Sequence, residues 1–195
     1  ASQSGTMNTV GVSHYLRMLK NAVDDLRNGN KEETETSDQP VEIQLPVEAF
    51  IPSFYITESE EKISVYQKLA GSEDETILGE FEQDLREEYG EPPAQVVNLF
   101  GILRLKMACR RGGVVRVKAE DSGRKELEIV LTLAPHVTAK EIMQLLTVNS
   151  QWKISGSTLR ISQSALAIKD KDWVTELRTE IEALAKKKER KAATV

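Results

Sequence analysis

The feature that most constrains this chain is residues 94–111, which predict a helix that is apolar on nearly every side. Pro92-Pro93 comes just before it, where the missing N–H of proline costs no helical hydrogen bond. Gly112-Gly113 follows it and predicts its end. A helix without a polar face has to be surrounded by other elements. We therefore predict that this is the central helix. Its apolar residues are Val96, Val97, Leu99, Phe100, Ile102, Leu103, Leu105, Met107, Ala108 and Cys109.

Helices also dominate the chain before this point. An apolar stripe at spacings of three and four predicts a helix over residues 10–28. Residues 30–39 hold no apolar side chain and predict a linker. We accordingly expect a terminal segment of a preceding module over 1–29, a linker over 30–39 and a further domain over 40–195.

Two capping boxes, Thr57 with Glu60 and Ser72 with Glu75, predict the next two helix starts. The second of these helices should end at Gly90. The apolar spacing predicts two inward faces: Ile63, Tyr66, Leu69 and Ala70 on the first helix, and Ile77, Leu78, Phe81, Leu85 and Tyr89 on the second.

The hydrophobic period changes from helix to strand after residue 113. Val115 and Val117, followed by a turn and then Leu127, Ile129 and Leu131, predict a hairpin. A third capping box, Thr138 with Glu141, predicts a short helix. A second hairpin over 152–161 and a helix over 170–188 follow, while residues 41–45 predict a short strand that ends at Pro46. This order predicts an α+β fold with a small antiparallel sheet packed on helices and an appended N-terminal helix.

Few residues suit catalysis or metal binding. The only cysteine, Cys109, lies on the apolar helix, and the two histidines, His14 and His136, are far apart in the sequence. No phosphate-binding glycine loop occurs. We therefore expect no enzyme activity, metal or cofactor in this chain. The single cysteine fits a reducing compartment, and with no membrane-spanning segment we expect a cytoplasmic protein.

The charge is divided unevenly along the chain. Residues 1–100 hold 7 Lys/Arg and 20 Asp/Glu, whereas residues 101–195 hold 19 and 11. In the front half, Glu80, Asp84, Glu87 and Glu88 lie away from the apolar stripe of their helix, which suits a basic protein partner and is also typical of a solvated helix face. In the back half, basic residues allow an alternative function as a DNA-binding accessory domain. These are Arg104, Lys106, Arg110, Arg111 and the C-terminal lysines.

Several separated motifs resemble bacterial transcription-repair coupling factors. Gln3-Ser4-Gly5-Thr6-Met7-Asn8-Thr9-Val10-Gly11 resembles the end of their motor module, where a translocation motif is shared with a branch-migration helicase. Further motifs resemble the start of the C-terminal domain in that family, and the likeness is best over residues 3–112. They are Ile43-Gln44-Leu45-Pro46, Phe50-Ile51-Pro52, Tyr55-Ile56, Tyr66-Gln67-Lys68-Leu69-Ala70, Leu85-Arg86-Glu87-Glu88-Tyr89-Gly90-Glu91-Pro92-Pro93 and Leu103-Arg104-Leu105-Lys106.

The resemblance implies a regulatory domain without catalytic activity. In this family the ATP-driven translocase lies upstream, and the C-terminal domain covers a UvrB-like module of the same protein, which limits recruitment of UvrA until stalled RNA polymerase is engaged. It further implies that Asp84, Glu87 and Glu88 face that module, although Glu88 stands where the family often has arginine. Gln3 matches the glutamine of the translocation motif. We expect no DNA contact by this domain and no membrane partner.

Overall fold

The computed structural model describes residues 41–72, 74–123, 126–148, 151–166 and 172–192. Its described residues belong to two compact units, one containing Pro46–Phe100 and the other Gln39–Leu45 with Gly101–Val195. The helix predicted over 10–28, the linker over 30–39 and Gln3 lie outside the described residues. The predicted boundary between residues 29 and 40 therefore stays a prediction.

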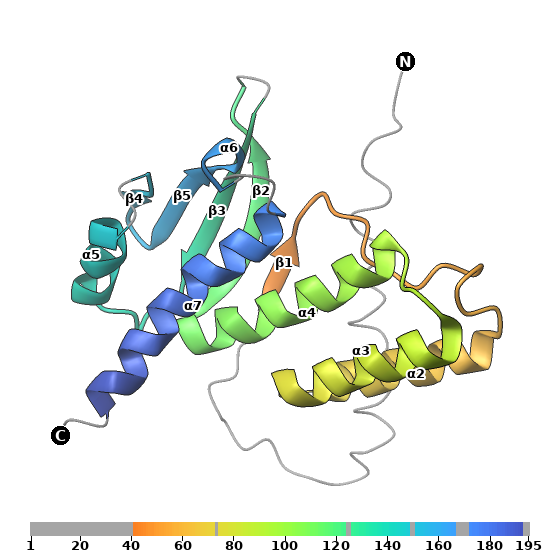
Figure 1. Ribbon diagram of the computed structural model, residues 1–195. Helices are drawn as coiled ribbons and strands as arrows, with labels where there is room; N and C mark the ends of the chain where they lie inside the picture. Colours follow the sequence, from red (N-terminus) through yellow and green to blue (C-terminus); the bar gives the residue numbers. More distant parts are fainter. Residues whose placement is uncertain (1–40, 73, 124–125, 149–150, 167–171, 193–195) are drawn as a thin grey trace, which may run out of the picture. The chain divides into compact units, whose positions relative to one another are not determined.

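The first unit is helical (Figure 1). Helices α2 (Ser59–Gly71) and α3 (Glu75–Tyr89) lie side by side as an antiparallel hairpin, and α4 (Ala94–Gly112) begins in this unit. Lys68 of α2 lies over the ring of Phe81 of α3, 5.5 Å from its centroid. The core of the unit consists of buried aliphatic and aromatic side chains. They include Ile51, Ile56, Val65, Tyr66, Leu69, Leu78, Leu85, Val96, Leu99 and Phe100.

Helix α4 meets the expectation for the apolar helix, except that Ile102 is only half-buried and one further apolar side chain is exposed. Fully buried side chains lie along its whole length, including Leu99, Leu105 and Cys109. Val97 was expected to be buried but is exposed. Gly113, with φ 73°, follows the last residue of α4 in a backbone conformation that favours glycine.

Two of the three predicted capping boxes are wrong. Helix α2 starts after Glu58, whose side chain forms no capping hydrogen bond, so Thr57 is not the cap. Helix α3 starts after Asp74, whose Oδ1 accepts from the Thr76 backbone N–H at 2.6 Å. Ser72 instead donates its hydroxyl to the carbonyl of Lys68 at the end of α2. An aspartate at the N-cap accepts from the backbone N–H two residues later as well as serine would.

The inward faces of α2 and α3 are also narrower than the spacing suggests. Ile63 is 40% exposed and Ile77 is 55% exposed, although both were expected to be buried. Ala70 is exposed too, while Val65 is buried in its place. An apolar spacing shows which residues share a helix face but not how much of that face a neighbour covers.

The second unit contains a five-stranded sheet with strand order β1-β2-β3-β5-β4. The strands are β1 (Glu42–Gln44), β2 (Val114–Asp121), β3 (Leu127–Leu133), β4 (Lys153–Ser155) and β5 (Thr158–Ser162). Both predicted hairpins and the α+β class are confirmed. The sheet is mixed rather than antiparallel, because β1 pairs with β2 in parallel. A parallel pair needs a long connection, and here the chain forms α2, α3 and α4 between β1 and β2 in the sequence.

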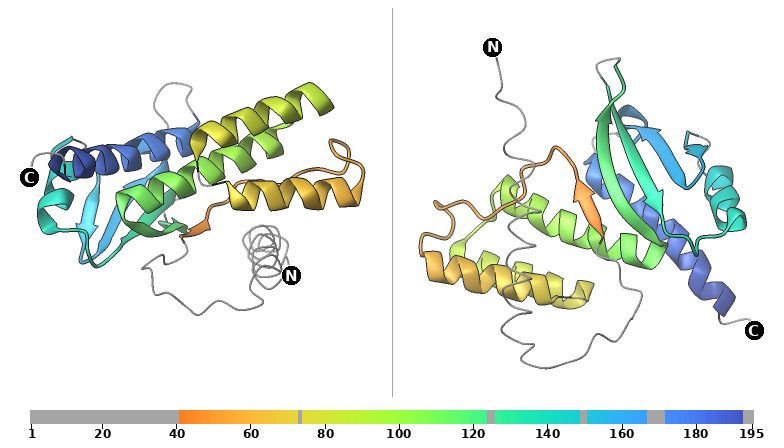
Figure 2. Two further views of the ribbon diagram at one scale, coloured as in Figure 1. Left: turned by 90° about the horizontal axis from the view of Figure 1, so that it is seen from below. Right: turned by 180° about the vertical axis from the view of Figure 1, so that it is seen from behind.

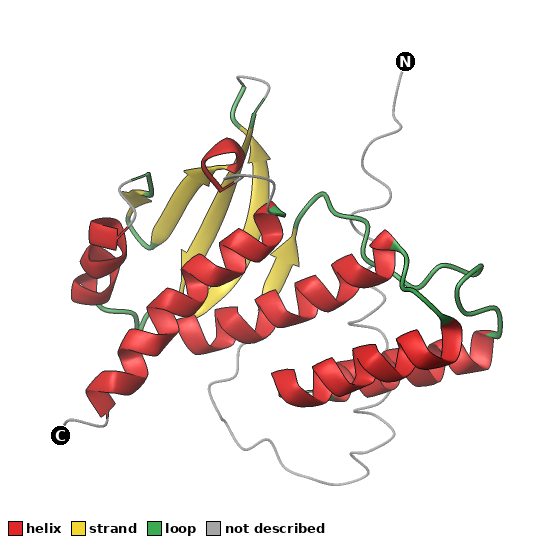
Figure 3. Ribbon diagram, in the orientation of Figure 1, coloured by secondary structure: helices red, strands yellow, loops and turns green. Residues whose placement is uncertain are grey.

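Helices cover one face of this sheet (Figure 2, Figure 3). Helix α7 (Trp173–Ala192) and the second part of α4 lie against it, and the opposite face is left open by them. The covered face buries Val117, Ile129, Leu131, Leu159 and Ile161. A register shift between Val114 and Arg116 buries Val114 rather than the expected Val115.

Two short helices complete the second unit. They are α5 (Ala139–Val148) and α6 (Gln163–Leu166). The capping box that was predicted to start α5 is confirmed. The Glu141 carboxylate accepts from both the backbone N–H and the hydroxyl of Thr138 at 2.7 Å, and the Glu141 N–H donates back to the Thr138 hydroxyl at 3.4 Å.

Candidate protein-interaction surface

An exposed group of carboxylates lies on the C-terminal half of α3. Burial of Leu78 and Leu85 sets the rotation of this helix, and Asp84, Glu87 and Glu88 consequently point to solvent. We call these three residues the acidic surface. The helix ends at Gly90, which has φ 83° and donates its backbone N–H to the carbonyl of Arg86 at 3.0 Å.

The acidic surface is not neutralised by neighbouring cations. Within the described parts of the chain, none of its three carboxylates takes part in an ion pair of the kind that Arg86 forms with Glu91 at 3.1 Å. The Glu87 carboxylate accepts a hydrogen bond from the amide of Gln83 at 2.8 Å, which leaves its charge in place. Three negative charges therefore remain available to a partner.

The neighbouring end of α2 extends this negative potential. Glu60 and Glu61 lie in the first turn of α2. The pKa of the Tyr89 hydroxyl is raised, first by burial and then by the charges of Glu61 and Glu88, so these two carboxylates flank the same phenol. Glu61 of α2 thus lies beside Glu88 of the acidic surface. Sequence spacing could not reveal this, because the two helices meet only in the folded hairpin.

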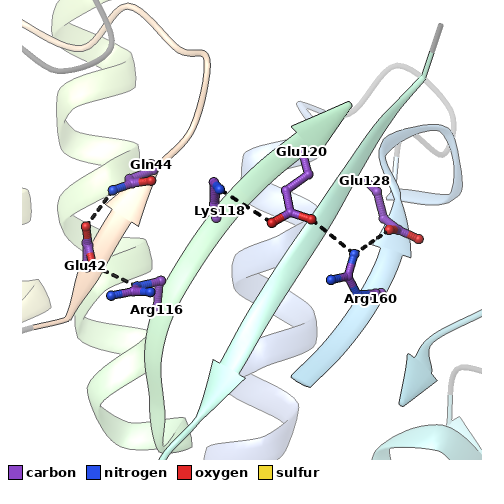
Figure 4. Close-up of polar contacts among 7 residues, drawn as sticks. All are labelled: Glu42, Gln44, Arg116, Lys118, Glu120, Glu128 and Arg160. Atoms are coloured by element: carbon purple, nitrogen blue, oxygen red, sulfur yellow. Dashed lines mark hydrogen bonds and ion pairs between the residues drawn. The ribbon is translucent and has the colours of Figure 1, made fainter. Parts of the chain in front are cut away.

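A second charged surface lies on the second unit, and it is compensated internally (Figure 4). On the open face of the sheet, Arg116 pairs with Glu42 at 2.8 Å. Arg160 lies between Glu120 at 3.1 Å and Glu128 at 2.9 Å. Lys118 completes the row, 3.5 Å from Glu120. Each cation here already has a carboxylate, so this face offers less net charge to a partner than the acidic surface does.

The basic residues of the alternative hypothesis are partly engaged within the second unit. Arg111 lies 3.8 Å from Glu182 of α7, and Glu182 also pairs with Arg178 at 3.4 Å. The Nε atom of Arg110 is buried and has no hydrogen-bond partner among the described residues. These arginines at the C-terminal end of α4 also lie where the helix dipole favours positive charge.

The cysteine and the histidine of the described chain do not belong to the acidic surface. Cys109 is fully buried, and burial raises the pKa of its thiol to about 12, as expected for a core residue. His136 lies in an exposed loop before α5. Across the described ranges, no three His, Cys, Asp or Glu side chains gather closely enough to hold a metal ion. Within the same ranges no helix has the length and apolar character needed to span a membrane.

The fold of this chain matches that of a domain whose structure has been solved. The crystal structure of the C-terminal domain of a transcription-repair coupling factor superposes on it with a TM-score of 0.60 and 17% identity, covering 78% of this chain and 99% of that one. Identity this low shows the fold alone.

The family follows from the sequence comparisons. The TRCF domain family matches residues 45–142, which is half of the chain, so the chain belongs to this family. A transcription-repair-coupling factor of Escherichia coli (strain K12) is 28% identical over 184 residues, covering 92% of this chain and 16% of that protein. One from Buchnera aphidicola is 32% identical over 121 residues, covering 62% of this chain and 15% of its own length. The chain thus spans about a sixth of the length of these relatives.

Proposed function

We propose that this domain regulates the protein to which it belongs by covering a UvrB-like module of that protein, and that it thereby limits recruitment of UvrA. The proposal rests on the motifs that resemble transcription-repair coupling factors and on the TRCF domain match over residues 45–142. It assigns the acidic surface as the part of the domain that faces the module.

The observation that carries the proposal is that the acidic surface lies where its charges destabilise α3. Asp84 and Glu88 are four residues apart on one helix, and like charges at this spacing repel. Glu87 and Glu88 also lie in the last turn of α3, where the partial charge of the helix end is already negative. A basic partner would relieve both unfavourable terms, which supports a binding role for these charges.

For the parent protein we propose an ATP-driven DNA translocase that acts on stalled RNA polymerase and couples transcription to DNA repair in the cytoplasm. Its motor lies outside this chain, and Gln3 is the remaining part of its translocation motif. The present domain then has no catalytic role and needs no cofactor.

The test is a binding measurement between the 195-residue chain and the UvrB-like module of the same protein. A variant with Asp84→Asn, Glu87→Gln and Glu88→Gln removes three charges and keeps the side-chain shapes. Exposed ion pairs contribute about 0.2–1 kcal/mol each, so for three pairs we expect roughly 3- to 150-fold weaker binding at low salt.

The control variant removes two negative charges elsewhere in the described chain. Asp121→Asn keeps an acceptor for the Gly123 N–H, which donates to the Asp121 side chain at 2.8 Å, and Glu176→Gln lies on α7. This control should bind the module like the native chain, because neither of its two carboxylates belongs to the acidic surface. Equal binding by the native chain and the triple variant would contradict the proposal. Tight duplex-DNA binding that weakens steeply with salt would favour the alternative function instead.

A further inference from the structure

One aromatic side chain of the first unit stands almost fully in solvent. Phe54 is 77% exposed, whereas Ile51 and Ile56 of the same segment are buried and Phe50 is 37% exposed. A phenyl ring left in water forgoes the favourable burial available to it. Single exposed apolar residues are common on protein surfaces, so the case for a role depends on how this residue is held and what surrounds it.

The backbone around Phe54 is held rigidly. The N–H groups of Tyr55 and Ile56 both donate to the carbonyl of Pro52, at 3.1 and 3.2 Å, and close a tight turn. On one side of Phe54, the Lys62 ammonium donates to the Ser53 hydroxyl at 3.0 Å. A side chain presented from such a turn loses little backbone freedom when a partner binds it, which favours affinity.

The turn is attached to the end of α3 that carries the acidic surface. The Tyr55 hydroxyl lies 3.1 Å from the Leu85 carbonyl and 3.0 Å from the Gly90 carbonyl, and its ring lies 5.9 Å from that of Tyr89. Figure 1 shows the loop before α2 at the same end of the hairpin as the end of α3.

The two features are close enough for one partner to cover both. Asp84 and Gly90 are separated by about 9 Å along the helix, at 1.5 Å per residue. A standard interface covers about 800 Å² on each partner, which is roughly 30 Å across. A single footprint of this size can therefore include Phe54 together with the acidic surface.

We propose that Phe54 is the apolar anchor of this interaction surface and inserts into an apolar pocket of the partner that is bordered by basic side chains. The proposal rests on the proposed function, because it uses the same surface, and it adds the chemistry of the partner's complementary site. Hot spots of interfaces are typically aromatic side chains in desolvated pockets, surrounded by polar residues that exclude water. The acidic surface supplies such polar residues around Phe54 on this domain. Charge complementarity then requires cations around the pocket of the partner.

The first test compares Phe54→Ala with the native chain in the same module-binding measurement. A hot-spot aromatic predicts about 30-fold weaker binding on truncation. Ile77→Ala is the matched control, because Ile77 is 55% exposed at the other end of α3, and it should bind normally. Both variants should keep the melting temperature of the native chain, since neither removes a buried contact.

Salt distinguishes the apolar anchor from the charges. The loss caused by Phe54→Ala should be the same at low and high ionic strength, whereas the loss in the triple-charge variant should shrink as salt screens the carboxylates. Normal binding by Phe54→Ala, together with weakened binding by the triple-charge variant, overturns the anchor and leaves the proposed function standing. Normal binding by both overturns the two together.

Photocrosslinking identifies what covers the ring. With p-benzoylphenylalanine incorporated at position 54 of the full 195-residue chain, we expect a crosslink to the module, at a site that mass spectrometry places among apolar and basic residues. A crosslink to residues 1–40 of the same chain, or to a second copy of it, would show a different occupant and overturn the proposal.

Discussion

The Tyr55 hydroxyl lies 3.0 Å from the carbonyl oxygen of Gly90, the residue that terminates α3. This contact joins the loop before α2 to the end of α3, thirty-five residues later in the chain. It therefore connects the turn that presents Phe54 with the helix that presents the acidic surface.

Tyr55→Phe should weaken this connection without changing the shape of the side chain. A typical intramolecular hydrogen bond contributes about 0.5–1.5 kcal/mol, so we expect a loss of about 1 kcal/mol in the free energy of unfolding. Urea denaturation followed by circular dichroism measures it. The change should also weaken module binding when the turn loses its position, and an unaltered midpoint would show that the hydroxyl is satisfied equally well by water.

Neutralising the acidic surface should stabilise the isolated domain. The triple variant with Asp84→Asn, Glu87→Gln and Glu88→Gln removes repulsion within α3 and unfavourable charge at its C-terminal end. We expect a gain of several tenths of a kcal/mol in unfolding free energy at low salt, together with weaker binding of the module. Loss of stability in this variant would mean that the carboxylates support the fold.

The capping boxes that look alike in sequence should respond differently to the same substitution. Thr138→Ala removes a hydroxyl that exchanges hydrogen bonds with Glu141 and should cost about 0.5–2 kcal/mol. Thr57→Ala is the matched control and should cost much less, because α2 begins after Glu58 and lacks a side-chain cap. Chemical denaturation of the two variants provides the comparison, and equal losses would contradict the assigned helix starts.

The buried thiol of Cys109 should make stability fall at alkaline pH. Burial raises its pKa from the ordinary value of 9.0 to about 12, so the unfolded chain releases this proton at lower pH than the folded chain does. The thiol's contribution is complete below pH 9.0 and is lost as the pH rises from there towards about 12.

Thiol labelling provides an independent measurement of this burial. Reaction of Cys109 with a thiol reagent at pH 8 should be slow in the native chain and fast in urea, since the thiolate is the reactive form. Cys109→Ala should reduce the alkaline loss of stability measured by denaturation. Rapid labelling of the native chain would show that the thiol is accessible.

The sequence by itself determined the elements whose information is local. Pro92-Pro93, Gly90 and Gly112-Gly113 mark the ends of helices, and the Thr138–Glu141 box marks the start of α5, because each acts within one turn of backbone. The change of hydrophobic period likewise predicted both hairpins and the α+β class. The exposure of Asp84, Glu87 and Glu88 followed from the apolar stripe of their own helix.

Tertiary structure decided the rest, because the relevant partners are distant in the chain. Which elements pack together decides the parallel pairing of β1 with β2 and the approach of Glu61 to Tyr89. It also decides the ion pairs that Arg116 forms with Glu42 and Arg160 forms with Glu120. The same holds for Ile63 and Ile77, which periodicity marked as buried and which the described structure covers only in part. Phe54 shows the limit most clearly: its segment reads as apolar, and only the hydrogen bonds of Tyr55 and Lys62 decide that this ring, rather than Ile51 or Ile56, faces the solvent.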